Sequence, residues 1–299
     1  MKKQDIDKNI IRQYWNKRTP QKWYSDRKYD LLFFNELSHK RYDVYYQYLK
    51  SEAEFEYHAN EKVLEIGVGI GTDLASYAKN GSKVSGIDLT QEAIDLTSKH
   101  FQVKGLKAES LLVADAENLP FEENSFDLVY SFGVLHHTPD VSKAVSEILR
   151  VLKPQGKFIV MLYRRGWKHY LKRSIINGIF RGQFFKHGYE KTISKNTEVE
   201  GNSPLTYVFK KSEIKKMFSR ANKVSIEKHR LGEFFDYAPY ETIRLPIFIS
   251  RIFYLFGLEK LIGENYIIKG YKRKDADELS DKKKMSAWEV LTNTYKNYK

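Results

Sequence analysis

Between residues 60 and 163, short apolar runs rich in β-branched residues alternate with segments whose apolar positions recur at helical spacing. Apolar runs without alternation are typical of strands covered on both faces, and their alternation with helices indicates parallel strands joined by crossover helices. Strands are predicted over residues 63–66, 84–88, 111–115, 126–131 and, after a turn at 153–156, 157–163. Helices are predicted from the turn at 67–71 to about 79, over 91–103, and from an N-cap at Asp140 to about 151.

Beyond residue 163 the pattern is interrupted twice, over 164–209 and over 232–263. Outside the interruptions it predicts a helix over 211–220, a strand over 224–229 and a last strand over 266–272. Ahead of the sheet, residues 30–49 are predicted as one helix with a broad aromatic face. The whole pattern predicts an α/β fold, with a Rossmann-like, doubly wound and mostly parallel seven-stranded sheet and helical cap insertions.

Composition narrows the class of protein. The chain has no cysteine, which excludes disulfides, thiolate metal sites and cysteine nucleophiles and agrees with a reducing compartment. We assign no metal site. The net charge of +13 is uneven, since residues 60–163 carry −4 and residues 164–299 carry +14. The basic excess lies outside the predicted sheet. It therefore favours a solvated surface and a basic tail over a nucleic-acid partner.

No targeting or membrane-spanning segment is predicted. The N-terminal residues lack the apolar stretch of a signal peptide, and no apolar run is long enough to cross a bilayer. The nearest approach, residues 245–263, is interrupted by Arg251, Glu259 and Lys260. We therefore expect a cytoplasmic protein. If it contacts a membrane, we expect the contact to be peripheral and to be made by residues 245–263.

The candidate chemistry begins at the first predicted strand, which ends in three alternating glycines and enters a helix. Such a turn lets a ligand approach the backbone closely, because no Cβ intervenes. Acids accompany it: Glu65 precedes the glycines, Asp88 ends the second strand, and Asp115 ends the third. Each acid alone is better explained as a cap or turn residue, but together they converge at the sheet edge where doubly wound folds bind ligands.

These motifs resemble the class I S-adenosylmethionine-dependent methyltransferases, and are similar to the ubiquinone/menaquinone-biosynthesis type. The resemblance covers residues 61–163 and is carried by the motifs LEIGVGIGT, Asp88-Leu89, ADAENLPF, FDLVYSFGVLHHTPD and ILRVLKPQGKFIV. One departure is Gln155, where the family usually has glycine, in a turn away from the chemistry.

The resemblance implies S-adenosyl-L-methionine as cofactor and a set of binding residues. The methionyl part would lie at Glu65 and the glycines, the ribose at Asp88, and the adenine edge at Asp115 and Ala116. The complete implied set is Glu65, Gly67, Gly69, Gly71, Asp88, Leu89, Asp115, Ala116, Glu117 and Ser131. A nicotinamide-dependent dehydrogenase is the rival class, but the spacing here is G-x-G-x-G, without the third glycine of G-x-G-x-x-G, and ADAENLPF has no counterpart in that fingerprint.

Methyl transfer to a hydroxyl or an acidic carbon also needs a base. His136 and His137 are paired directly after the fourth strand, at the ligand edge, and either can serve. The alternative is that they only fix the loop.

The domain organisation follows from these assignments. Residues 60–163 would be the cofactor-binding core, completed by a helix and strand (210–231) and a last strand (264–274). The remaining segments would be an N-terminal helical cover (1–59), two caps (164–209 and 232–263) and a basic tail (275–299).

Both caps leave strand ends that face the cofactor and are rich in aromatic and basic residues. They predict an acceptor that is a small-molecule, glycan-precursor or lipid-like compound, methylated at O or C. An RNA methyltransferase using the basic flanks, a membrane-surface enzyme with a lipid-linked acceptor, and a non-enzymatic cofactor-binding protein remain alternatives.

Overall fold

The computed structural model of the chain describes residues 6–18, 28–166, 203–229 and 263–274, with six single residues between 179 and 192. In the described residues ahead of the sheet, the helical elements are α1 (Lys8–Asn16), α2 (Leu31–His39), the π-helix η1 (Lys40–Tyr45) and α3 (Leu49–Ala53). Most of the predicted caps, residues 245–263 apart from its last residue, and the tail beyond 274 lie outside the described residues.

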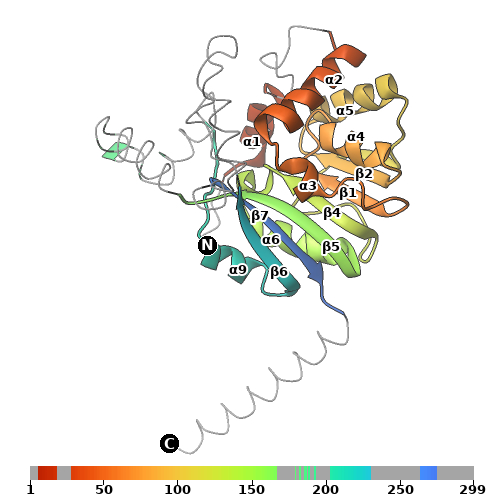
Figure 1. The fold of residues 1–299 in the computed structure, drawn as a ribbon. Coiled ribbons are helices and arrows are strands. Elements are labelled where there is room, and N and C mark those ends of the chain that lie inside the picture. Colours follow the sequence, from red (N-terminus) through yellow and green to blue (C-terminus); the bar gives the residue numbers. More distant parts are fainter. Residues whose placement is uncertain are drawn as a thin grey trace, which may run out of the picture.

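Seven strands form one sheet in the order β3-β2-β1-β4-β5-β7-β6. Figure 1 shows β6 and β7 beside β5 at one side of this sheet. They are β1 (Lys62–Ile66), β2 (Lys83–Asp88), β3 (Ser110–Val113), β4 (Phe126–Phe132), β5 (Leu152–Tyr163), β6 (Ala221–His229) and β7 (Asn265–Lys272). The first five are parallel, and β7 runs antiparallel between β5 and β6. This sheet confirms the predicted seven-stranded, mostly parallel, doubly wound fold.

The sheet is covered on both faces, as its apolar strands require. The connecting helices are α4 (Thr72–Lys79), α5 (Gln91–Lys104), the short 3-10 helix η2 (Leu135–His137), α6 (Val141–Val151) and α9 (Lys211–Met217). Alternate residues of a strand face opposite sides. Accordingly Val129 packs in one core with α6 and α9, while Leu128 and Tyr130 pack in the other with α4 and α5.

Short polar side chains start several of these helices by accepting a hydrogen bond from a first-turn amide. Asp140 accepts from the backbone N of Lys143 at 3.0 Å, which confirms its predicted role as the N-cap of α6. Thr90 caps α5 in the same way.

The single helix predicted over residues 30–49 is wrong. Asp30 caps α2, which ends at His39, and the chain continues as η1 and then breaks before α3. The wider π turn, closed by the amide of Tyr46 on the carbonyl of Arg41, presents two consecutive side chains to α4. Tertiary contacts of Arg41 and Tyr42, described below, are the physical reason for this departure.

The predicted turn at 153–156 is a distortion within β5. Gln155 has φ +64°, a left-handed conformation for which glycine is the usual residue, and β5 already begins at Leu152. Strand β3 ends at Val113, so Asp115 lies just beyond the strand that it was predicted to end. Within the described part of the chain, no helix is both long and apolar enough to cross a membrane.

Candidate functional site

A cavity of about 280 Å³ lies where the turn between β1 and α4 meets the ends of β2 and β4. It forms at the carboxyl edge of the parallel strands, where doubly wound folds bind ligands. The predicted site residues that line it are Glu65, Gly67, Gly69, Asp88, Leu89, Asp115, Ala116 and His137. Residues up to 72 positions apart in the sequence therefore line one cavity. This agrees with the prediction that the motifs converge at one edge of the sheet.

The three glycines of the turn differ in what surrounds them, although all have positive φ angles of 82°, 56° and 74°. A Cβ on Gly67 would lie 2.2 Å from Val134, and one on Gly71 would lie 2.7 Å from Thr97. At Gly69 nothing lies within 4 Å of the Cβ position. Gly67 and Gly71 are thus needed for packing, whereas Gly69 opens onto space that a ligand can use.

Asp88 ties the end of β2 to the glycine turn. Its Oδ2 accepts from the backbone N of Gly69 at 3.1 Å, and its Oδ1 accepts from the amide and hydroxyl of Thr90 at 3.0 and 2.9 Å. Burial raises the pKa of Asp88, and the hydrogen bonds from these amides oppose the increase. The carboxylate is therefore held rigidly at the rim of the cavity.

Glu65 is a buried acid whose Oε2 has no hydrogen-bond partner among the described residues. Burial, and secondly the neighbouring Asp73 carboxylate, raise the pKa of Glu65 well above its ordinary value. A buried acceptor without a donor is costly, and such groups mark places where a ligand supplies the missing partner.

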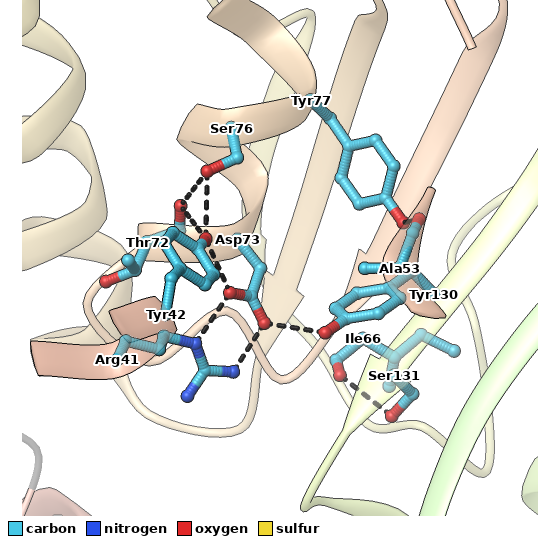
Figure 2. Close-up of polar contacts among 10 residues, drawn as sticks. All are labelled: Arg41, Tyr42, Ala53, Ile66, Thr72, Asp73, Ser76, Tyr77, Tyr130 and Ser131. Atoms are coloured by element: carbon cyan, nitrogen blue, oxygen red, sulfur yellow. Dashed lines mark hydrogen bonds and ion pairs between the residues drawn. The ribbon is translucent and has the colours of Figure 1, made fainter. Parts of the chain in front are cut away.

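Figure 2 shows a network around Asp73, in the first turn of α4, that the sequence analysis missed. Arg41 donates to both carboxylate oxygens, from Nε at 2.6 Å and from Nη2. Tyr42 donates its hydroxyl to Oδ1 at 2.9 Å and Tyr130 donates to Oδ2 at 2.7 Å. The network docks η1 onto α4 and places the Arg41 guanidinium in the wall of the cavity.

The electrostatics of this network favour the charged form of its arginine. Burial alone would lower the pKa of Arg41, but the Asp73 carboxylate outweighs it and the pKa is raised well above its ordinary value. Burial raises the pKa of Tyr130 well above 10, so this hydroxyl stays a donor to Asp73. The cavity wall therefore presents the fixed Arg41 cation beside several carboxyl groups.

The N-terminal helix α1 also contributes to the cavity wall, through Ile11 and Trp15. Lys8 of this helix forms ion pairs with Asp115 and, at 2.7 Å, with Glu117. These bonds join residues more than a hundred positions apart in the chain. Nothing local in the sequence marks Lys8 as a partner of these acids.

Four predicted site residues do not line the cavity. Ser131 is buried and donates to the carbonyl of Ile66 at 3.0 Å, which joins β4 to β1. Gly71 is the residue before α4, and Glu117 accepts from the amide of Asp140 as well as from Lys8. His136 is fully buried with its ring centroid 3.8 Å from that of Tyr163. Their surroundings indicate supporting roles behind the cavity.

His137 differs from His136 because it lines the cavity. Its ring centroid lies 4.7 Å from that of Trp15, in an edge contact, and its Nδ1 donates to the carbonyl of Leu205 at 2.9 Å. Of the two histidines, His137 is the one whose ring meets the space where a ligand fits.

Comparison with known proteins identifies the domain that contains these residues. A family model described as "Methyltransferase domain" matches residues 64–160. An uncharacterized methyltransferase, YcgJ, of Bacillus subtilis is 36% identical over 34% of this chain and 41% of its own length. Sterol 4-C-methyltransferase strm-1 of Caenorhabditis elegans is 36% identical over 34% of this chain and 30% of its own length. Demethylmenaquinone methyltransferase of Clavibacter sepedonicus is 33% identical over 38% and 49%.

The chain thus spans less than half the length of each of these relatives. Among solved structures, phosphoethanolamine N-methyltransferase 2 of Haemonchus contortus, in complex with S-adenosyl-L-methionine, has a TM-score of 0.55 at 18% identity, covering 87% of this chain and 60% of that chain. This likeness shows the shared Rossmann-like fold. The matched segment contains the glycine turn, the acids and the paired histidines described above, so residues 64–160 of this chain are a methyltransferase domain of the S-adenosylmethionine-dependent family.

Proposed function

We propose that this protein is an enzyme that transfers the methyl group of S-adenosyl-L-methionine to an oxygen or carbon of a small-molecule, glycan-precursor or lipid-like acceptor. The observation that carries the proposal is the cavity in which the unpartnered Glu65 oxygen, the open Gly69 and the fixed Asp88 meet. Each matches a different part of the cofactor.

The residues present fit the cofactor group by group. Glu65 would accept from its ammonium group and Arg41 would pair with its carboxylate, because the cavity offers a buried acceptor and a cation side by side. Asp88 would accept from the ribose hydroxyls, and Asp115 with Ala116 would face the adenine edge. Leu89 would lie against the ribose and adenine. When bound, the cofactor supplies a methyl group on a sulfonium.

The chain's own contribution to the chemistry is orientation and a base. The buried wall holds the reactants and excludes water, and orientation supplies much of the acceleration in such displacements. His137 would take the proton of the acceptor, because it is the histidine that lines the cavity. His136, packed behind it against Tyr163, would position the loop.

Acceptor recognition is assigned to the caps, over 164–209 and 232–263, as proposed from the sequence. Two of the relatives have names that fit apolar, ring-shaped acceptors, since one is a sterol and one a demethylmenaquinone methyltransferase. The cysteine-free sequence supports a cytoplasmic enzyme. A screen of quinone, sterol, phospholipid and glycan-precursor acceptors with methyl-labelled S-adenosylmethionine tests the class, and vesicles and RNA as added competitors test the membrane and nucleic-acid alternatives.

Cofactor binding is expected to depend on Asp88. Asp88→Ala should weaken S-adenosylmethionine binding about ten- to hundredfold, because a charge-assisted hydrogen bond to the ribose is worth about 1.5–3 kcal/mol. Calorimetric titration measures this. The matched control is Asp127→Ala, which removes a carboxylate of the same sheet that is paired with Lys153 outside the cavity. Equal affinities for wild type and folded Asp88→Ala protein would move the cofactor elsewhere.

The role of Gly69 can be tested against a matched control, because Gly105 has a similar backbone conformation and similarly open surroundings. Both have positive φ, 56° and 63°, and at both positions a Cβ would meet nothing within 4 Å. Alanine at either site should therefore cost a similar 1–2 kcal/mol of stability. Only Gly69→Ala should also weaken S-adenosylmethionine binding, by about tenfold or more, since its Cβ fills the space that the ligand needs. If Gly69→Ala binds S-adenosylmethionine as tightly as Gly105→Ala and the wild type do, the turn does not contact the cofactor.

A further inference from the structure

The glycine turn between β1 and α4 accepts hydrogen bonds from two side chains of α5. Thr97 donates its hydroxyl to the carbonyl of Gly69 at 3.3 Å, and Nδ1 of His100 lies 2.9 Å from the carbonyl oxygen of Ile70. Because Thr97 and His100 are three positions apart on α5, both lie on one face of the helix. Both carbonyls belong to residues that line the cavity, and the two side chains of α5 are not among its lining residues.

A turn built on three glycines needs such contacts, because glycine favours no single backbone conformation. Asp88 accepts from the backbone N of Gly69 at 3.1 Å, so Gly69 is bonded through both its N–H and its C=O groups. Helix α5 also lies so close to the turn that a Cβ on Gly71 would be 2.7 Å from Thr97. The path of the turn therefore depends on α5 as well as on its own sequence.

His100 can bond to the turn only as a donor. The oxygen of Ile70 is a carbonyl oxygen without a proton, so the imidazole carries its proton on Nδ1. Burial lowers the pKa of His100 to about 4, which keeps the ring neutral near pH 7. The buried ring stacks on Phe34 of α2, with centroids 4.1 Å apart and planes inclined by 7°. The ring is thus fixed at its edge by the hydrogen bond and at its face by the stack.

Packing alone does not explain a histidine at this position. Phenylalanine would fill a similar space beside Phe34 without burying two nitrogens. Nε2 of His100 is buried and has no hydrogen-bond partner among the described residues, which costs free energy. What histidine adds over phenylalanine is the hydrogen bond to the carbonyl of Ile70.

We propose that His100, assisted by Thr97, is a positioning residue that keeps the glycine turn in the shape that receives S-adenosylmethionine. This inference rests on the proposed methyltransferase function. The His100 ring also links the turn to α2, because Phe34 stacks on it. Leu37 of the same helix belongs to one apolar cluster with Ile70 and lines the cavity. Docking of α2 and the shape of the cofactor cavity are therefore coupled through one imidazole.

Two substitutions of His100 keep different halves of its interactions and so test its role. His100→Phe keeps a ring beside Phe34 and removes the donor, whereas His100→Asn removes the ring and keeps a side-chain N–H near the place of Nδ1. We expect His100→Phe to weaken S-adenosylmethionine binding about three- to tenfold, the equivalent of one hydrogen bond. His100→Asn should bind within about twofold of the wild type. Calorimetric titration of the full chain measures both affinities.

Binding by folded His100→Phe protein as tight as that of the wild type would overturn the inference, and so would binding by His100→Asn no tighter than that by His100→Phe. Thr97→Val is the second variant, should His100→Phe not fold. It keeps the shape and removes the other donor, so it should weaken binding about two- to fivefold. Unchanged affinity in Thr97→Val would then count against the proposal.

Tyr77→Phe is the matched control. It also removes one donor from a buried backbone carbonyl, because the hydroxyl of Tyr77 donates to the carbonyl of Ala53 at 2.6 Å. Tyr77 does not line the cavity. The substitution should lower the stability of the fold and leave cofactor affinity unchanged. A loss of affinity equal to that of His100→Phe would overturn the positioning role, because general loosening of the fold would then explain both.

Amide hydrogen exchange reports on the turn without any cofactor. The amide of Gly71 donates to the carbonyl of Val68 at 2.7 Å inside the turn, and the amide of Ser125 donates to the carbonyl of Val151 at 2.8 Å away from the cavity. His100→Phe should speed exchange at Gly71 about three- to tenfold and leave the rate at Ser125 unchanged. An unchanged rate at Gly71, or an equal increase at both amides, would contradict a local effect on the turn.

The same titrations separate this inference from the function on which it rests. Absence of S-adenosylmethionine binding by the wild type would reject the methyltransferase proposal, while hydrogen exchange would still report on the turn. A wild type that binds the cofactor, together with a His100→Phe variant that binds it equally well, would reject only the positioning role.

Discussion

Asp73→Ala is expected to lower the free energy of unfolding by about 3–5 kcal/mol, the range for removing one partner of a buried ion pair. The Asp73 side chain is almost completely buried and accepts from Arg41, Tyr42 and Tyr130. Without it, a guanidinium and two hydroxyls lose their partner in a place that water reaches poorly. Denaturant unfolding followed by circular dichroism measures the loss.

A double-mutant cycle identifies the source of this loss. Arg41→Met removes the cation and Asp73→Leu removes the anion, and the double variant should be destabilised by less than the sum of the two, by about 0.5–3 kcal/mol. Tyr130→Phe deletes a single hydrogen bond to the same carboxylate and should cost about 1 kcal/mol. Strictly additive losses, or an Asp73→Ala effect no larger than that of Tyr130→Phe, would contradict the view that this network fastens η1 to α4.

His137→Asn should lower kcat by about 10²-fold or more while leaving cofactor affinity nearly unchanged. Asparagine can still donate a side-chain N–H to the carbonyl of Leu205, so the contact that anchors the loop is retained. It has no basic nitrogen, so proton removal from the acceptor is lost. Single-turnover methyl transfer to an acceptor found by the screen measures the chemical step.

The same substitution separates the two roles that the sequence left open for the paired histidines. If His137 only fixes the loop, His137→Asn should turn over at nearly the wild-type rate, because the structural hydrogen bond survives. His136→Asn is the companion variant. Its main effect should be a lower free energy of unfolding and not a lower rate of methyl transfer. His136 is buried against Tyr163 and does not line the cavity.

The sequence by itself determined most elements of the sheet and the edge at which the candidate cavity lies. Strand and helix positions were predictable because burial on two faces imposes continuous apolar runs, and crossover helices impose their own period. The glycine turn was predictable because positive φ and close packing select glycine locally, as Gly67 and Gly71 show. Asp88 and Asp115 followed, since parallel strands bring their carboxyl ends to one edge.

Only the tertiary structure decided which other side chains pair with one another around this edge of the sheet. Arg41 pairs with Asp73 across 32 positions, Lys8 with Asp115 across 107, and His137 with Leu205 across 68. No local periodicity encodes such pairs, because each depends on how separate elements dock. The same reason broke the predicted helix over 30–49: Arg41 and Tyr42 are both drawn to α4, and the gain from the buried network outweighs the preference for a continuous helix. Which of two adjacent histidines lines the cavity was likewise decided by tertiary packing, since only His137 lies among the lining residues.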